Sequence, residues 1–269
     1  MTAVDRHNVQ VFGRPDGQPI MFSHGFGCDQ QMWRHVAPAF ADDHRVILFD
    51  HVGCGGSDTS AYNPLLYSTL NRYASDVVEI VEELDLSDVI FVGHSVSSMI
   101  GVLAHLAAPD RFAALALVSP SPRYIDDGGY VGGFSESDIT ELFFSLDSNY
   151  LGWSQSITPV IMGEQDDPAL TNELTASFCR LDPTIALQFA RVTFLSDNRD
   201  DLPKVTVPTL VVQCAFDAIA PPVVGTYVSE QIAGSELCVL DVAGHCPNMS
   251  APHETTEALK AFLSGLPRP

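Results

Sequence analysis

The sequence predicts an α/β protein whose single sheet is mostly parallel and is covered by helices on both faces. Two observations carry this prediction. Short apolar runs alternate with longer segments of helical pattern, and one run, Val89–Gly101, turns at Ser95 from a strand into a helix of small residues. Such alternation is typical of parallel strands joined by crossover helices. The 269 residues, 46% of them hydrophobic, suffice for one domain with a substantial core.

The first half of the chain supplies four of the expected strands and, besides the helix that follows Ser95, two further helices. The expected strands are Ile20–Ser23, Arg45–Asp50, the run from Val89 to the turn at Ser95, and Ala114–Val118. One helix is expected around Met32–Phe40. A second is expected over Tyr73–Leu84, where valines and a leucine recur at helical spacing. We place the core of the protein at 1–120 and 205–269.

The strand rhythm stops between Ser119 and Pro208, where helical segments are separated by glycine, proline and aspartate. We expect a helical lid over 121–204, because this segment is rich in large apolar side chains. A lid in this place would roof a pocket above Ser95, so the substrate should be largely apolar. Strands resume at Thr209–Cys214 and Leu237–Asp241.

The turn at Ser95 has the residue types of a nucleophile elbow. In that motif a strained strand-to-helix turn exposes a serine hydroxyl above the sheet, and the flanking residues must be small. Gly93 and Ser97 meet this requirement, although serine stands where the motif usually has a second glycine. An ordinary strand-to-helix turn is the alternative interpretation of this segment taken alone.

An acid and a histidine follow the serine in the order that such a site requires, each after an expected strand. Asp217 follows the strand at 209–214, and His245 follows the strand at 237–241. Serine is a poor nucleophile unless a base takes its proton, and the base needs a carboxylate to fix its tautomer. The sequence therefore predicts a catalytic triad of Ser95, His245 and Asp217.

Two backbone amides are expected to form an oxyanion hole. One belongs to Val96, the residue after the serine, and the other to Phe26, in the loop after the strand Ile20–Ser23. Glycines beside Phe26 let this loop fold beneath a substrate carbonyl. His24 and Gly25 can also be read as a tight turn in which the histidine orients the loop, and the two interpretations are compatible.

The charge and hydrophobicity of the sequence exclude some classes of binding partner. A formal net charge of −21, with only 13 lysines and arginines, argues against a nucleic-acid partner and disfavours an anionic membrane surface. The chain starts with polar residues and has no apolar run of about 20 residues, which predicts a cytoplasmic protein without membrane contact. Six cysteines without a C-x-x-C pair predict reduced thiols. We expect no cofactor and no metal.

Several motifs together resemble a known family. They are His24-Gly25-Phe26-Gly27, Gly93-His94-Ser95-Val96-Ser97, Ser119-Pro120-Ser121-Pro122-Arg123-Tyr124, Gly132-Gly133-Phe134, Asn149-Tyr150 with Trp153, Ser196-Asp197 with Arg199, and Gly244-His245-Cys246-Pro247. Over nearly its whole length the chain resembles the α/β-hydrolase group of the bacterial sigma-B stress-regulator hydrolase and the plant strigolactone and karrikin receptors. The resemblance implies an α/β-hydrolase fold, with an eight-stranded, mostly parallel sheet and a lid of four helices inserted after the sixth strand.

The resemblance also implies a small hydrophobic cavity beside the triad. In family members the lid aromatics that match Phe134, Trp153 and Phe194 line this cavity. The full set that we expect around the substrate is His24, Phe134, Trp153, Phe189, Phe194, Ile219 and Cys246.

Three functions stay open within this family, because one fold hosts many activities. The first is a serine hydrolase that cleaves an ester or lactone of a small apolar compound through an acyl-enzyme. The second is a slow-turnover ligand sensor that acts through a partner protein in stress signalling, such as a regulatory phosphatase. The third is hydrolysis of a carbon–carbon bond in a diketone. Multiple turnover favours the first, ligand-dependent partner binding the second, and activity confined to diketones the third.

Overall fold

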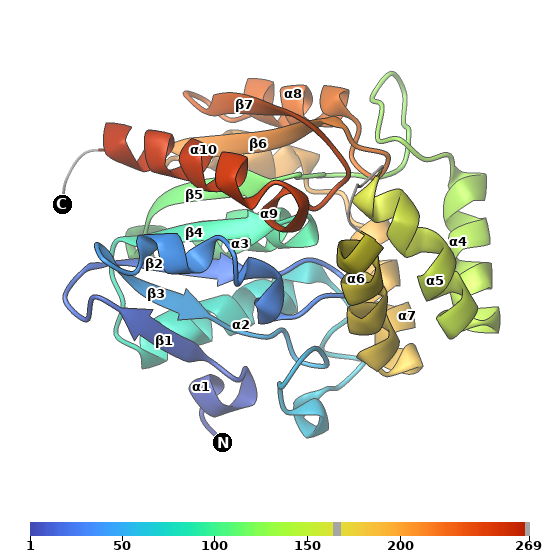
Figure 1. Ribbon diagram of the computed structural model, residues 1–269, viewed down its shortest axis with the longest axis horizontal. Coiled ribbons are helices and arrows are strands. Elements are labelled where there is room, and N and C mark those ends of the chain that lie inside the picture. Colours follow the sequence, from blue (N-terminus) through green and yellow to red (C-terminus); the bar gives the residue numbers. More distant parts are fainter. Residues whose placement is uncertain (164–167, 267–269) are drawn as a thin grey trace.

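One seven-stranded sheet runs through the residues that the computed structural model describes, 1–163 and 168–266 (Figure 1). Its strands are β1 (Gln10–Gly13), β2 (Gln18–Ser23), β3 (His44–Leu48), β4 (Val89–His94), β5 (Phe112–Val118), β6 (Thr209–Phe216) and β7 (Glu236–Ala243). The order across the sheet is β1-β3-β2-β4-β5-β6-β7. The β1–β3 pair is antiparallel and the other neighbouring pairs are parallel. The predicted mostly parallel sheet is therefore confirmed.

The expected eight strands are one too many for the described residues. Before β1 the chain forms a short helix, α1 (Ala3–Arg6), whose first turn is capped by the Thr2 hydroxyl. The Ala3 amide donates a hydrogen bond to Glu83 at the end of α2 (Leu70–Glu83). Because these first residues form a helix docked on α2, they add no strand to the edge of the sheet. The helices expected after the sixth strand therefore follow the fifth, β5.

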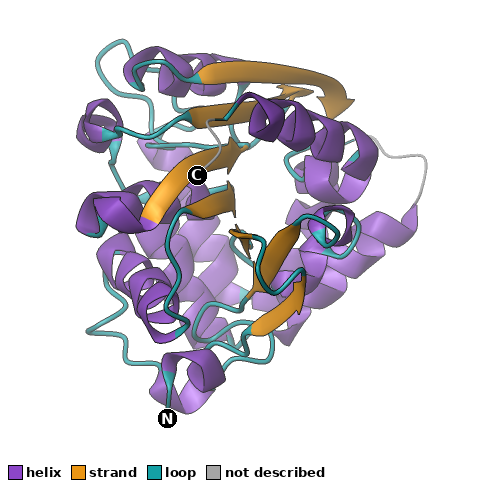
Figure 2. Ribbon diagram, turned by 90° about the vertical axis from the view of Figure 1, so that its left-hand side faces the viewer, coloured by secondary structure: helices purple, strands orange, loops and turns teal. Residues whose placement is uncertain are grey.

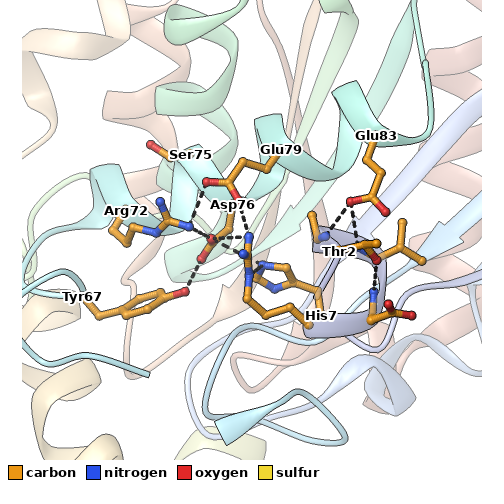
Figure 3. A network of polar contacts seen from close by, with 12 residues as sticks. Thr2, His7, Tyr67, Arg72, Ser75, Asp76, Glu79 and Glu83 are labelled. Carbon is orange, nitrogen blue, oxygen red and sulfur yellow. Dashed lines mark hydrogen bonds and ion pairs between the residues drawn. The ribbon is translucent and has the colours of Figure 1, made fainter. Parts of the chain in front are cut away.

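A buried carboxylate on α2 holds this N-terminal segment in place (Figure 3). Asp76 is fully buried and accepts hydrogen bonds from the Tyr67 hydroxyl, at 2.7 Å, and from the guanidinium groups of Arg6 and Arg72. His7 Nε2 lies 3.4 Å from the same carboxylate, and His7 Nδ1 contacts a carbonyl oxygen just after β3 at 3.0 Å. A buried charge is stable only when it is paired and hydrogen-bonded in this way.

Helices cover both faces of the sheet, and Figure 2 shows the strands between two helical layers. Alternate residues of a strand point to opposite faces. Met21 of β2 thus belongs to the apolar cluster that includes α2, α3 (Val96–Ala107) and α8 (Pro222–Gln231). Its neighbours Ile20 and Phe22 belong to the cluster that includes α10 (Pro252–Gly265). Burial on both faces explains why the central strands are continuous apolar runs.

The helix expected at Met32–Phe40 is wrong. Two short 3-10 helices, η1 (Gln30–Trp33) and η2 (Ala37–Phe40), occupy this stretch. Pro38 lacks an amide hydrogen and its ring clashes with the preceding helical turn, which disfavours a continuous α-helix over this short stretch. The expected helix at Tyr73–Leu84 is confirmed as α2, which begins earlier, at Leu70. The remaining short elements are η3 (Thr59–Ala61), η4 (Pro109–Arg111), η5 (Arg199–Lys204) and α9 (Pro247–Ser250).

Four α-helices among the described residues lie between β5 and β6 in the chain and gather at one end of the sheet (Figure 1). They are α4 (Glu136–Ser148), α5 (Tyr150–Met162), α6 (Pro168–Arg180) and α7 (Pro183–Phe194). Side chains begin three of them: Ser135 caps α4, Asn149 caps α5 and Asp182 caps α7. Residues 164–167 of the expected lid and 267–269 of the expected core lie outside the described residues. None of the helices in the described ranges is both long and apolar enough to cross a membrane.

Candidate active site

Ser95 lies in a strained turn between β4 and α3. Its backbone has φ 57° and ψ −122°, a region that residues other than glycine rarely adopt. The Ser95 amide donates a hydrogen bond to the Val118 carbonyl of β5 at 2.8 Å, which fixes the turn on the sheet. No residue larger than glycine fits at Gly93, because a Cβ atom there would lie 2.4 Å from the Ser97 carbonyl oxygen. The turn thus has the geometry expected of a nucleophile elbow.

The structure brings the three predicted triad residues together. His245 Nε2 lies 2.7 Å from Ser95 Oγ, and His245 Nδ1 lies 2.7 Å from Asp217 Oδ2. The other oxygen of Asp217 accepts hydrogen bonds from the amides of Ile219, at 2.8 Å, and Ala220, at 3.0 Å. These bonds leave Oδ2 aimed at the imidazole. The arrangement allows proton transfer from the serine to a base whose orientation is fixed by a carboxylate.

The backbone of His245 is held by two other elements. Its amide donates to the Ile161 carbonyl at the end of α5, at 2.6 Å, and its carbonyl oxygen lies 2.8 Å from His94 Nε2. Burial, with a smaller contribution from His245, lowers the pKa of His94 to about 3, so this imidazole is neutral at neutral pH. Nε2 must then carry the proton, because a carbonyl oxygen can only accept. His94 therefore connects the elbow to the loop that carries the base, a role that its position in the motif does not reveal.

The loop after β2 lies against the elbow. A Cβ atom on Gly25 would lie 2.5 Å from His94 Nδ1 and 3.4 Å from Ser95 Cβ, so only glycine permits this approach. Phe26 follows directly and lines the cavity beside Ser95. Val96 is the first residue of α3, and an amide at that position has no acceptor within its own helix. The surroundings of both amides fit the predicted oxyanion hole, which stays a prediction.

A buried polar network supports this loop from behind. The Ser97 hydroxyl donates to the His24 carbonyl at 2.5 Å and contacts Ser23 Oγ and His51 Nε2, both at 2.9 Å. His24 Nε2 accepts the His51 amide at 3.0 Å, so His24 Nδ1 carries the proton and donates to the Gly25 carbonyl at 2.9 Å. Burial lowers the pKa of both imidazoles. We had expected His24 on the cavity wall. The structure instead places it beneath the loop, where both of its ring nitrogens bond to backbone groups.

Ser97→Ala should destabilise the protein by about 1–3 kcal/mol, because the buried His24 carbonyl would lose its hydroxyl donor, whereas Ser23 Oγ and His51 Nε2 keep each other as partners at 3.2 Å. Ser98→Ala is the matched control: its buried hydroxyl makes one bond, to the Gly93 carbonyl at 2.9 Å. Urea unfolding of both variants measures the difference. A loss in Ser97→Ala no larger than that in Ser98→Ala would show that the network contributes little.

An apolar cavity opens beside Ser95, with about 550 Å³ of empty space that includes some open solvent. Its wall includes Phe134, Trp153, Phe194, Ile219 and Cys246 from the expected set. Phe189 is not on the wall: it is fully buried, stacks on Tyr73 with ring centroids 4.6 Å apart and supports Phe26 from outside the cavity. The set expected around the substrate did not include the other lining residues, Cys28, His94, Tyr124, Leu142, Ile157, Ile161, Leu174, Phe178 and Thr193.

Tyr124 is the most informative of these additional residues. It is buried, follows β5 in the chain, and its hydroxyl lies 3.3 Å from Ser95 Oγ. Burial raises the pKa of Tyr124, so the phenol stays protonated and can donate a hydrogen bond. Tyr124 ends one of the motifs shared with the family, but no residue pattern in that segment predicts a contact with Ser95.

Comparison with known protein families connects this geometry with a known group. The model described as the alpha/beta hydrolase family matches residues 20–258. The chain belongs to the alpha/beta hydrolase family. The matched range spans the sheet from β2 onward and includes Ser95, Asp217 and His245. The alpha/beta hydrolase fold predicted from the sequence is therefore confirmed.

Among alpha/beta hydrolases, the chain is similar to plant receptors and to a bacterial enzyme. It is 39% identical to karrikin insensitive 2 receptor CA of Petunia hybrida over 249 residues, 92% of each chain. It is 36% identical to strigolactone esterase D14 of Arabidopsis thaliana over 257 residues, 95% of this chain and 96% of that protein. The solved structure of olei00960, a hydrolase from Oleispira antarctica, superposes with a TM-score of 0.95 at 39% identity, covering 98% and 96% of the two chains. The resemblance to the plant receptor group is confirmed.

Proposed function

We propose that the chain is a serine hydrolase that cleaves an ester or lactone bond of a small apolar compound through an acyl-enzyme. The observation that carries the proposal is the continuous line of hydrogen bonds from Ser95 Oγ through His245 to Asp217, on the wall of an apolar cavity. The cavity is lined mainly by hydrophobic and aromatic side chains, with a few polar groups beside Ser95, as small-molecule sites usually are. Residues 121–204 would act as the lid, since α4 to α7 contribute a large part of the wall.

The mechanism follows from the roles that these groups can take. His245 Nε2 removes the proton from Ser95 as Oγ attacks the carbonyl carbon. The amides of Phe26 and Val96 would donate hydrogen bonds to the oxyanion of the tetrahedral intermediate. When this intermediate collapses, the leaving alcohol takes the proton from His245 and the acyl group stays on Ser95. Water, activated by His245, then releases the acid and restores the serine.

The relatives support ester chemistry in different degrees. Strigolactone esterase D14, at 36% identity over 95% of this chain, carries the word esterase in its name. A solved enol-lactonase from Burkholderia xenovorans LB400 is only 22% identical, so that likeness bears on the fold alone. A lactone contains the same ester linkage within a ring, and its cleavage needs the same groups in the same order.

Covalent labelling tests the nucleophile directly. A serine-directed fluorophosphonate should label the native protein, and fragment spectra of the tryptic peptide 73–111 should place the adduct on Ser95. The physical reason is that only a serine activated by a neighbouring base attacks the phosphorus rapidly. Protein denatured before labelling is the control and should stay unmodified. An adduct on another serine, or equal labelling of the denatured protein, would contradict the proposal.

A second function is favoured by the receptor relatives. The 39% identity to karrikin insensitive 2 receptor CA makes a ligand sensor the alternative, in which slow hydrolysis or retention of the acyl group changes the affinity for a partner protein. A regulatory phosphatase is the partner type that the family resemblance suggested. The two functions differ in turnover number, because a sensor needs one ligand per signalling event and an enzyme needs many.

A further inference from the structure

One buried hydroxyl on the cavity wall has no partner among the described residues. Thr193 lies on α7, has 1% of its surface exposed, and lines the cavity that contains Ser95. Its Oγ1 atom makes no hydrogen bond within the described part of the chain. Buried polar atoms nearly always find a partner, so a group left unpaired in an apolar wall calls for an explanation.

Two other buried hydroxyls on helices bond to a carbonyl one turn earlier. Ser154 donates to the Tyr150 carbonyl one turn earlier at 2.8 Å, and Thr255 donates to the Ala251 carbonyl at 2.9 Å. This back-bonding is the usual solution for serine and threonine inside a helix. Thr193 lacks that bond, so a residue on the cavity wall carries a hydroxyl that no group of the described chain satisfies.

The rest of the wall offers few competing polar groups. His94 Nδ1 is the other buried and unpaired side-chain atom among the lining residues of the described chain. It faces the backbone of Gly25, because a Cβ atom there would lie only 2.5 Å away. A ligand group therefore has no room at His94 Nδ1. The Tyr124 hydroxyl already lies within hydrogen-bond distance of Ser95 Oγ.

We propose that Thr193 is a specificity-determining residue whose hydroxyl binds a second oxygen of the substrate. The substrate class is then an ester or lactone of an otherwise apolar compound that carries a further ketone, ether or hydroxyl oxygen, away from the bond that is cleaved. A substrate without this oxygen leaves the Thr193 hydroxyl unpaired, and sites built around a hydrogen bond discriminate against such analogues. This inference rests on the proposed function for its chemistry, but its test does not depend on turnover.

The test measures binding to the Ser95→Ala protein, which should bind esters without cleaving them. Trp153 lines the cavity, so its fluorescence reports occupancy. The probes are ethyl hexanoate, ethyl 4-oxohexanoate and ethyl 5-oxohexanoate. We expect at least one oxo ester to bind more tightly than the hexanoate. Adding Thr193→Val should raise the Kd of that oxo ester about 3- to 10-fold and change the Kd of the hexanoate by less than about two-fold, since one neutral hydrogen bond is lost.

Thr158→Val is the matched control. Thr158 is fully buried on α5, but its hydroxyl is paired with Thr175 Oγ1 at 2.6 Å and it does not line the cavity. This variant should leave the ratio of the Kd values unchanged. If the ratio of the Kd of the hexanoate to that of the oxo ester is the same with and without Thr193→Val, the inference is overturned. The absence of saturable binding for every probe would overturn it as well. Selective binding that Thr193→Val removes, in a wild-type protein that hydrolyses none of the three esters, would refute the proposed function and keep the inference.

Discussion

Ser95→Ala is expected to lower kcat for short aryl esters by about 10⁶-fold, the order of loss seen when a serine nucleophile is removed from a triad. Ser95 Oγ is the atom that would form the covalent bond to the acyl group, and alanine leaves His245 with no hydroxyl to activate. The remaining acceleration would come only from the oxyanion amides and from binding. Steady-state rates of the two proteins, determined at equal concentration, measure the effect.

The fold must be intact for this comparison to be meaningful. Ser95→Ala removes a strained serine from a turn with positive φ, and alanine has the same steric difficulty there, so the thermal transition should stay close to that of the wild type. Reaction with the fluorophosphonate should disappear together with the activity. If the variant kept more than about 1% of the wild-type rate, another group would be the nucleophile.

Asp217→Asn is expected to lower kcat by about 10⁴-fold, with little change in structure. Asparagine keeps an oxygen for the amides of Ile219 and Ala220, but its NH₂ group then faces His245 Nδ1. The imidazole is driven to the tautomer that has its proton on Nε2, and this tautomer cannot accept the proton of Ser95. The loss should appear in kcat more than in KM, because the acid does not line the cavity.

Asp241→Asn provides the control for a carboxylate near the same loop. Asp241 lies on β7, four residues before His245, and is exposed. Its replacement should leave kcat within about two-fold of the wild type, as surface substitutions usually do. A loss of only a few-fold in Asp217→Asn would indicate that a different acid orients the imidazole.

The sequence predicted those features that depend on local pattern and on chain order. Ser95, Asp217 and His245 each follow an apolar strand, and parallel strands bring their carboxyl ends to one edge of a sheet. The predicted strands and α2 were therefore found, with small differences in their ends. The helix predicted at Met32–Phe40 was wrong because the prediction followed the apolar residues and neglected Pro38, which interrupts the backbone hydrogen bonds of a helix.

The features that the sequence did not predict depend on tertiary contacts. Tyr124 reaches Ser95, and Thr193 reaches the cavity, only because the segments after β5 and on α7 fold over the carboxyl end of the sheet. His24 was expected in the pocket because it precedes the oxyanion loop. Its hydrogen bonds to the backbone of His51 and Gly25 direct the ring inward, and these partners cannot be read from its neighbours in the sequence.

A stopped-flow time course of phenol released from a short aryl acetate shows whether Ser95 turns over many substrate molecules. We expect linear release over many equivalents per mole of protein, and loss of this release in Ser95→Ala. A burst of about one equivalent followed by near silence would contradict it, because the acyl group would then stay on the protein as in a single-use sensor.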